Sequence, residues 1–301
     1  MKRFPALLLL IWLLNVAPLL AGQNNARIDR WHSWVCTNLV ESARRMDHFF
    51  SNDLVREEEN DTRLRVSFGP EFRERGESVM RQRVSLRLHL PQFEERMSFF
   101  VEEIADDVLD VMMGEGDDER ARSGLRVRLR ERKHMKSDIS GSVRLSSGEL
   151  DPYVRLRSRW SFPLESWLFE PTQFLFWRRQ VGFGMRSRLD IIRPLTERQI
   201  VRLRTQGTWT ENVPGVDWLV ESGYFFKFHN GNGFNLSGYV DGKAHAENTR
   251  AEVYKVKSVW RQRIYRDWLF IETGPDVRWR RIDDFRTDPG FTILLEINAG
   301  R

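Results

Sequence analysis

The stretch Gly124–Arg130, Gly-Leu-Arg-Val-Arg-Leu-Arg, constrains the fold of this chain more than any other. Its apolar residues Leu125, Val127 and Leu129 fall on one side of an extended strand and the intervening arginines on the other, because side chains alternate with period two. The same alternation recurs almost to the C-terminus, and arginine often occupies the second side. A sheet with one apolar and one cationic face, closed on itself, is the architecture of an outer-membrane β-barrel.

The alternating segments predict an all-β, antiparallel transmembrane barrel with a short N-terminal helix. The segments 174–177 and 183–191 read as a hairpin with its tip near Arg179–Gly182, although one long strand would also fit. An even count is expected if both chain ends return to the same side, so we predict fourteen strands, with twelve as the alternative. The expected strands are centred on residues 64–68, 83–90, 97–101, 124–130, 139–145, 151–162, 174–177, 183–191, 201–209, 215–228, 234–240, 254–260, 269–279 and 291–297.

The connections fit a barrel with short turns on one side and longer loops on the other. Pro91–Glu95 and Arg132–Lys136 are short turns that fall on the same side of a fourteen-stranded barrel. The acidic segment Glu102–Arg120 falls on the opposite side and is expected to be an outer loop. Its carboxylates could hold a divalent cation that bridges lipopolysaccharide phosphates, or could simply be solvated. Tryptophans near strand ends would supply interfacial girdles, namely Trp160, Trp209, Trp218, Trp260, Trp268 and Trp279.

The first residues predict export. Residues 1–21 combine the basic Lys2 and Arg3, an apolar run and small residues near a cleavage point, as in a signal peptide. An uncleaved anchor helix is the alternative. Residues 22–61 should form a periplasmic amphipathic helix followed by an acidic linker, and residues 62–301 the barrel. Cys36 is the single cysteine, so it can form no internal disulfide and is expected to be a buried thiol.

Composition excludes some classes of function. The formal charge of +5 becomes +3 when Lys2 and Arg3 leave with the signal peptide (5 − 2 = 3), which is too small a bias to imply nucleic acid. One cysteine and six scattered histidines suggest no metal site and no cofactor. A soluble β-sandwich with one polar face would show the same alternation, but the export signal, the long strands and the tryptophan positions favour the membrane barrel.

The C-terminal region carries a resemblance. Arg266-Asp267-Trp268-Leu269-Phe270-Ile271-Glu272, with Pro275 and the closing Leu295-Glu296-Ile297, resembles the last strands of a group of uncharacterised bacterial outer-membrane β-barrel proteins. The group has no established activity, so the resemblance implies a fold and a location in the outer membrane. In that location we expect the barrel to contact membrane lipid and lipopolysaccharide and to be inserted by the outer-membrane insertion machinery. The chain departs from the usual pattern because Ala299, Gly300 and Arg301 stand where such barrels commonly end on an aromatic residue.

The second face of the strands predicts a polar lumen. One hypothesis is a pore whose arginines raise the local concentration of small anionic solutes. The other is that the arginines pair with carboxylates such as Asp217, Glu221, Glu272, Asp276 and Glu296 and brace the wall of a structural or partner-binding barrel. The residues predicted to line the lumen are Arg63, Arg65, Arg83, Arg87, Arg126, Arg128, Arg155, Arg157, Arg202, Arg204, Glu272 and Glu296.

A membrane-embedded lipid hydrolase is the third hypothesis, and it is the weakest. It would require a serine nucleophile with a histidine base nearby. His229 lies in a turn with no serine two positions on, His89 lies on a predicted strand with Ser85, and His32-Ser33 precedes the barrel. No nucleophile–base spacing is evident, so we expect no enzyme activity and assign no catalytic residue. The sequence does not indicate the oligomeric state.

Overall fold

The computed structural model describes most of the region that the sequence assigns to strands. The described residues are 63–75, 78–89, 97–103, 121–132, 134–146, 149–179, 181–228, 231–245, 248–265 and 268–300. The predicted signal peptide, helix, acidic linker and Cys36 lie outside these ranges, as do residues 104–120 of the predicted acidic loop.

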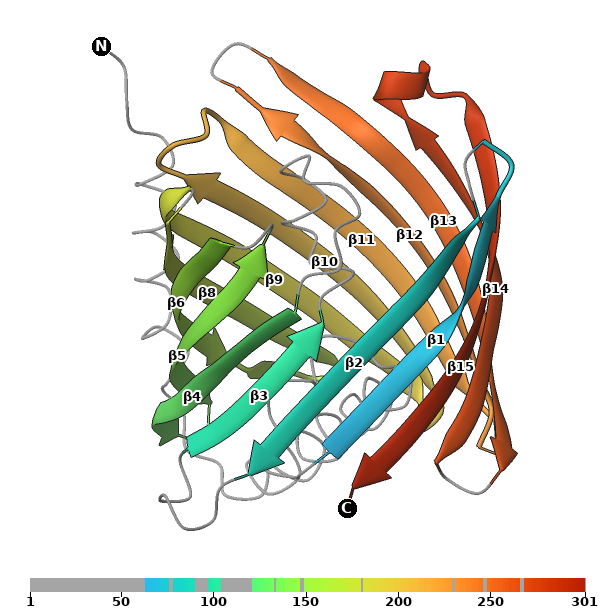
Figure 1. Ribbon diagram of the computed structural model, residues 1–301, viewed down its shortest axis with the longest axis horizontal. Coiled ribbons are helices and arrows are strands. Elements are labelled where there is room, and N and C mark those ends of the chain that lie inside the picture. Colours follow the sequence, from blue (N-terminus) through green and yellow to red (C-terminus); the bar gives the residue numbers. More distant parts are fainter. Residues whose placement is uncertain are drawn as a thin grey trace.

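The described chain is a single antiparallel sheet closed into a barrel (Figure 1). Successive strands pair with one another, except that the short segment Phe162–Leu164 continues the strand before it, and the first described strand pairs with the last, so that Arg63 lies opposite Gly300. The elements are β1 (Arg63–Arg73), β2 (Val79–His89), β3 (Met97–Glu103), β4 (Ala121–Arg132), β5 (Met135–Ser146), β6 (Glu149–Trp160), β7 (Phe162–Leu164), β8 (Trp167–Arg178), β9 (Gly182–Thr196), β10 (Gln199–Thr210), β11 (Val216–Lys227), β12 (Gly233–Ala244), β13 (Thr249–Tyr265), β14 (Leu269–Arg280), the 3-10 turn η1 (Arg281–Asp283) and β15 (Thr287–Gly300).

The barrel has fourteen strands, as predicted, because β6 and β7 act as one. Both segments pair with β8 in the same register, with Arg159 opposite Thr172 and Phe162 opposite Phe169, and only Ser161 interrupts the strand between them. The hairpin reading of β8 and β9 is also confirmed, because the two strands pair along their length, with Arg178 at the end of β8 opposite Gly182 at the start of β9. The alternatives of one long strand and of twelve strands are therefore wrong.

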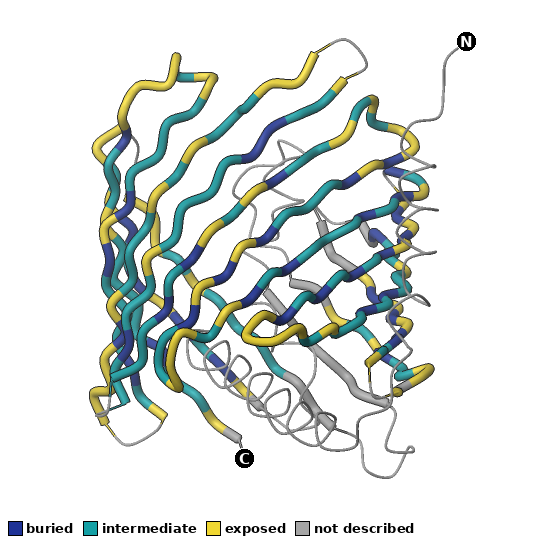
Figure 2. The backbone as a smooth tube through the Cα atoms, turned by 180° about the vertical axis from the view of Figure 1, so that it is seen from behind, coloured by how far each residue is buried: buried dark blue, intermediate teal, exposed yellow. Residues whose placement is uncertain are grey.

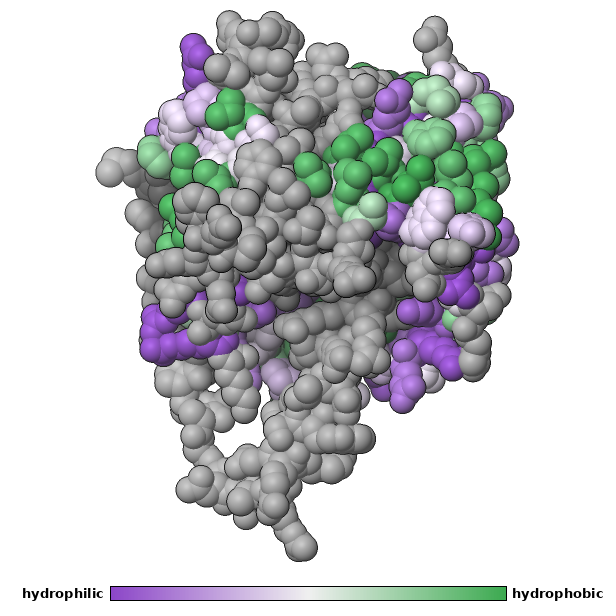
Figure 3. Space-filling view, turned by 60° about the horizontal axis from the view of Figure 1, so that its bottom comes forward, coloured by the Kyte–Doolittle hydropathy of each residue, from purple (hydrophilic) through white to green (hydrophobic). Residues whose placement is uncertain are grey.

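Exposure alternates along the strands as the sequence pattern requires (Figure 2). On β8, for example, Leu168, Phe174 and Phe176 are buried, whereas Leu175 and Trp177 between and beside them are exposed. Because the sheet is closed, the buried positions face inward and the exposed positions face outward. Most charged residues on the strands take inward positions, and most outward positions are apolar. Figure 3 shows hydrophobic residues gathered in a band with hydrophilic residues below it.

Several element boundaries differ from those predicted. β9 extends beyond the predicted strand 183–191, through Pro194 to Thr196, and its pairing with β10 shifts register at Gln199/Ile200. Trp260 lies inside β13 and not at its end, because β13 continues to Tyr265. Trp209 and Trp279 lie within two residues of the ends of β10 and β14. Periodicity does not predict η1, which is a short turn between β14 and β15.

Among the described residues, no helix has the length and apolar character needed to cross a lipid bilayer.

Candidate functional site: the inner face of the barrel

The structure places most of the predicted lumen residues on the inner face. Register puts them there, because each one faces another inward residue across its strand pair. Arg63 lies on β1 and Arg87 on β2, but their side chains are outside the description. The predicted residues whose side chains are described on this face are Arg65, Arg83, Arg126, Arg128, Arg155, Arg157, Arg202, Arg204, Glu272 and Glu296.

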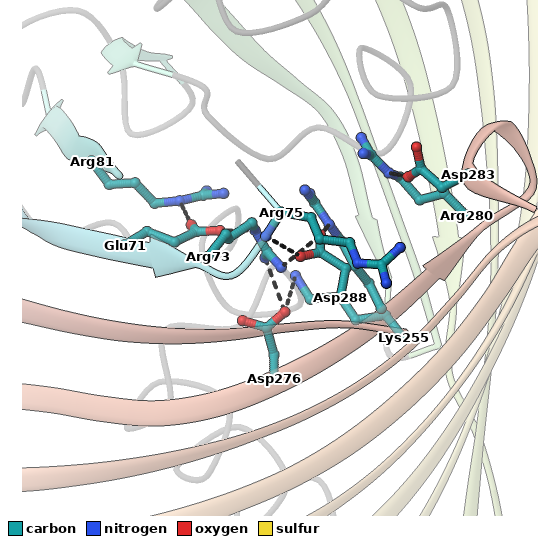
Figure 4. A network of polar contacts seen from close by, with 10 residues as sticks. Glu71, Arg73, Arg75, Arg81, Lys255, Asp276, Arg280, Asp283 and Asp288 are labelled. Atoms are coloured by element: carbon teal, nitrogen blue, oxygen red, sulfur yellow. Dashed lines mark hydrogen bonds and ion pairs between the residues drawn. The ribbon is translucent and has the colours of Figure 1, made fainter. Parts of the chain in front are cut away.

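A network of ion pairs crosses the seam where β1 meets β15 and β14 (Figure 4). Arg73 is its centre, since its Nε lies 2.7 Å from Glu71 Oε1 and its Nη2 donates to Asp276 Oδ2 at 2.9 Å. Glu71 also pairs with Arg81 of β2. Asp288 Oδ2 lies 3.7 Å from Arg73 Nη1. Two strands from the start of the barrel, β1 and β2, thereby share one cluster of charge with two strands from its end, β14 and β15.

Two further cations belong to this seam cluster. Arg278 Nε donates to Asp288 Oδ2 at 2.5 Å, and Lys255 Nζ lies 3.7 Å from Asp276 Oδ2. The backbone N–H of Arg75 donates to the other carboxylate oxygen of Asp288 at 3.3 Å. Charge-assisted hydrogen bonds of this kind are stronger than neutral ones, so the cluster fixes the register of the closing strands.

A second network crosses the same seam farther along β15. Arg261 of β13 makes a bidentate pair with Glu296, with Nη1 and Nη2 each donating at 2.7 Å, and Nη1 also donates to Glu272 at 2.5 Å. Arg65 Nε donates to Asn298 Oδ1 at 2.9 Å and lies 3.4 Å from Glu296. Arg261 and Glu296 are each 2% exposed, which makes this the most deeply buried bidentate pair described in the barrel.

On the opposite wall, built from β4, β5, β6 and β8, ion pairs join one strand to its neighbour. Arg157 donates twice to Asp138 Oδ2, from Nε at 2.8 Å and from Nη2 at 2.6 Å. Arg126 Nε lies 3.8 Å from the other oxygen of Asp138. Arg178 Nε donates to Asp151 Oδ2 at 2.5 Å. Each link joins neighbouring strands and braces the wall.

Asp190 of β9 organises the next sector. It is fully buried, its Oδ1 accepts a hydrogen bond from Arg204 Nε at 2.8 Å, and its Oδ2 lies 3.3 Å from Arg188 Nε. Glu221 of β11 lies 3.4 Å from Arg202 Nη2 and 3.7 Å from Arg204 Nη1. Four of the five carboxylates proposed from sequence as arginine partners thus make ion pairs: Glu221, Glu272, Asp276 and Glu296.

Arginines also stack on inward phenylalanines, which the sequence pattern did not predict. The carbon Cζ of Arg155, Arg186 and Arg188 lies 5.6, 5.6 and 5.3 Å from the ring centroid of Phe174. The same relation joins Arg202 to Phe225 at 5.1 Å and Arg261 to Phe270 at 4.1 Å. Inward phenylalanines break the expected polar periodicity because the ring lies under guanidinium groups and provides a favourable cation–π contact.

Positive charge is in excess on the wall formed by β6, β8, β9 and β10. The described inward side chains of these strands include eight arginines and three carboxylates. They are Arg155, Arg157, Arg159, Arg178, Arg186, Arg188, Arg202 and Arg204, against Asp151, Glu170 and Asp190. Such a surface attracts anions and repels cations.

No group of three or more His, Cys, Asp or Glu side chains in the described part of the chain could hold a metal ion. Of the histidines considered for hydrolysis, His229 and His32 lie outside the described residues, and the side chain of His89 is not described. The described inner face therefore offers ion pairing, anion attraction and hydrogen bonding as its chemistry.

Comparison with known proteins gives similarity in structure only. No protein-family model and no curated protein matches the sequence. The chain is similar to the KdgM porin in complex with disordered oligogalacturonate, at 7% identity and a TM-score of 0.37, over 77% of this chain and 98% of that one. It is similar to Pseudomonas aeruginosa OpdK with vanillate, at 9% identity and a TM-score of 0.47, and the match covers 80% of this chain and 98% of that one. It is similar to the outer-membrane channel DcaP of Acinetobacter baumannii, at 8% identity and a TM-score of 0.47, and the match covers 79% of this chain and 96% of that one.

Proposed function

We propose that this chain is a bacterial outer-membrane β-barrel that forms a channel favouring small anionic solutes. The observation that carries the proposal is the excess of arginine over carboxylate on the inward face of a closed barrel. On β6, β8, β9 and β10 the described inward side chains comprise eight arginines and three carboxylates. Guanidinium groups stay ionised at any physiological pH, so this wall keeps its charge.

The outward face supports the membrane location. Apolar side chains project from most outward positions, for instance Leu125, Val154 and Leu175, each of which is more than 40% exposed. A water-soluble barrel would expose polar groups there, whereas a bilayer requires apolar ones. The closed strand order leaves no unpaired sheet edge, which is the condition for crossing lipid with strands. The predicted signal peptide supports export to this compartment.

Selectivity would come from the charge of the wall. A cationic wall with low-dielectric surroundings raises the local concentration of anions and lowers that of cations. The selectivity should weaken as salt rises, since the Debye length shrinks from about 10 Å at 0.1 M to about 3 Å at 1 M. Arg83 and Arg128 are two of the inward arginines named for this role, and neither is fully buried.

The experiment has two stages. The protein from the membrane fraction is first run on a detergent gel with and without boiling, because folded barrels migrate differently from unfolded ones. Folded protein is then placed in a planar bilayer with a salt gradient, and the reversal potential gives the ratio of anion to cation permeability. We expect an anion-selective current. The double variant Arg83→Gln with Arg128→Gln should lower the ratio of anion to cation permeability, whereas Arg193→Gln, which changes an outward residue, should leave this ratio unchanged. Galacturonate and vanillate are useful test solutes because each carries a carboxylate.

The alternative is a structural or partner-binding barrel without conductance. The specific observation in its favour is the extent of ion pairing inside the wall, as in the seam cluster around Arg73 and the pair of Arg261 with Glu296. Paired charges stiffen a barrel and do not by themselves select an ion. A boiling-dependent band shift with no current in any salt would favour this alternative. A protein that stays in the soluble fraction with no shift would contradict both.

A further inference from the structure

Asp241 is the exception among the buried carboxylates of the described chain. Nine of the described carboxylate residues are buried, and eight of them make an ion pair with arginine: Glu71, Asp138, Asp151, Glu170, Asp190, Asp276, Asp288 and Glu296. Asp241 of β12 faces inward and is 7% exposed, yet its side chain makes no hydrogen bond and no ion pair with any described residue. A buried charge without a partner is costly, so proteins seldom retain one unless something compensates it.

The neighbours of Asp241 do not compensate its charge. Leu219 lies directly opposite it on β11, and Val253 lies directly opposite it on β13. Asp217 is two residues from Leu219 on the same face, a diagonal position whose Cα lies about 7–8 Å from that of Asp241. Glu252 is the extra residue where the register of β12 with β13 shifts, next to Val253. Asp241 therefore has like charges close by and no cation directly opposite.

Of the two neighbouring acids, Glu252 is neutralised and Asp217 is not. The carboxylate of Glu252 lies 2.6 Å from Arg250 Nε and 3.7 Å from Arg281 Nε. Asp217 lies directly opposite Lys243, but the side chain of neither makes an ion pair or hydrogen bond within the described ranges. Asp217 and Asp241 thus present two carboxylates to a single lysine, which leaves one negative charge uncompensated.

The hydroxyl of Thr208 is a second polar group without a partner at this place. Thr208 lies directly opposite Asp217 on β10 and is 2% exposed. Its Oγ1 atom has no hydrogen-bond partner in the part of the chain that the structure describes. A hydroxyl accepts hydrogen bonds as well as donating them, so a donor held beside Asp217 can give it the partner that it lacks.

The two carboxylates lie near one mouth of the barrel. Asp217 is at the start of β11 and Asp241 is near the end of β12, so both lie toward the end opposite Arg63 and Gly300 (Figure 1). The fully enclosed side-chain atoms that lack a partner include neither oxygen of Asp241. A solute that enters at this end can therefore reach the carboxylate.

We infer that Asp217 and Asp241 form a binding site for the primary ammonium group of a small organic solute. An ammonium group carries one positive charge and three N–H donors, whereas ionised carboxylates only accept hydrogen bonds. A metal ion suits the site less well, because the described residues hold no group of three His, Cys, Asp or Glu side chains placed to bind one. The inference goes beyond the proposed function, since it gives a barrel that attracts anions a discrete site for a cationic group.

The test is calorimetric titration of the folded, detergent-solubilised full-length protein with n-butylammonium and with butyltrimethylammonium. At about pH 8 carboxylates are ionised and an alkylamine is still protonated. Both probes carry one positive charge and a butyl chain, but only n-butylammonium has N–H donors. We expect saturable binding of n-butylammonium and binding of butyltrimethylammonium that is weaker on the order of 10-fold. Asp241→Asn should weaken n-butylammonium binding on the order of 10-fold or more, and Asp217→Asn should weaken it as well.

Matched carboxylates serve as controls. Asp284→Asn changes an exposed acid between β14 and β15 whose positive φ asparagine also adopts, so binding should be unchanged. Without ligand, Asp241→Asn should be at least as stable as the unchanged protein in urea unfolding, because it removes an uncompensated charge. Asp276→Asn should lose stability, because Asp276 is equally buried but pairs with Arg73. Lys243→Gln should bind n-butylammonium at least as tightly as the unchanged protein, since it removes a competing cation.

The outcomes separate this inference from the proposed function. The site is refuted if n-butylammonium does not bind, if Asp241→Asn binds it equally well, or if both probes bind alike, since a general negative potential would explain that. Binding seen only in Lys243→Gln would show that the lysine itself occupies the carboxylates. A ligand-free Asp241→Asn as unstable as Asp276→Asn would show that Asp241 has a partner within the chain. Anion-selective current without ammonium binding would keep the channel and reject the site, and binding without current would do the reverse.

Discussion

Replacement of Arg261 by methionine tests whether the buried networks hold the barrel together. Arg261 is 2% exposed and makes three hydrogen bonds to carboxylates, two to Glu296 and one to Glu272. Methionine keeps the length and apolar stem of the side chain, so its contact with the Phe270 ring is largely retained. The change therefore removes the charge and leaves Glu296, also 2% exposed, with less compensation.

The expected cost follows from that burial. Removing one partner of a buried ion pair costs about 3–5 kcal/mol, because the remaining charge stays in a low-dielectric site. Arg65 Nε lies 3.4 Å from Glu296 and offsets part of the loss, so we expect about 3 kcal/mol. In the double variant with Glu296→Gln the buried charge is gone, and the total cost should fall below the sum of the two single costs by roughly 1–3 kcal/mol.

The measurement is urea unfolding of the barrel in lipid vesicles, followed by the fluorescence of its 11 tryptophans. The control is Arg250→Met, which breaks an ion pair with Glu252 in which the arginine side chain is 48% exposed. That pair should contribute less than about 1 kcal/mol. If Arg261→Met costs no more than Arg250→Met, or if the double variant shows strict additivity, the reasoning about the buried network is refuted.

Two other predictions concern the backbone of the barrel. A Cβ on Gly274 would collide with the carbonyl oxygen of Ser258 on β13, so Gly274→Ala should destabilise the protein by roughly 1–3 kcal/mol in the same unfolding assay. Gly141 has nothing within 4 Å of its would-be Cβ, so Gly141→Ala should be neutral, and equal costs at the two sites would contradict the packing. Val66 lies opposite Ile297 across the seam, so Val66→Cys with Ile297→Cys in a Cys36→Ser background should form a disulfide on oxidation. Val66→Cys with Ile293→Cys should form none, and a disulfide in that control alone would show that the register is wrong.

The strands of this protein could be predicted from sequence because period-two alternation reports directly on which face a residue occupies. Leu125, Val127 and Leu129 face outward, and Arg126 and Arg128 face inward, as expected, with only a register shift between Arg128 and Arg130. The fourteen strands followed from the same pattern. The boundaries were less predictable, because alternation continues past a proline such as Pro194 when a bulge absorbs the missing hydrogen bond.

The ion-pair partners of the charged residues could not be predicted. Alternation shows which face of the sheet a side chain occupies, but it does not show which residue lies opposite on the next strand. Arg73 and Arg261 are the centres of the two seam networks, yet neither was among the arginines singled out from sequence. Each contacts acids more than ten residues away. The register across the β1–β15 seam determines the contacts of Arg73, and the registers of β13–β14 and β14–β15 determine those of Arg261.

The closing seam has a consequence for the order in which the molecule can be completed. Among the described strands β1 is synthesised first and its partner β15 last, so one edge of β1 cannot form its hydrogen bonds until residues 287–300 have been made. Until then Arg65 and Arg73 lack Glu296, Asp276 and Asp288, and an open sheet presents two unpaired edges. A chain that stops short of β15 would therefore keep every other hairpin and still be a substrate for aggregation and proteolysis. The fourteen residues of β15 therefore decide whether the other thirteen strands form a closed barrel.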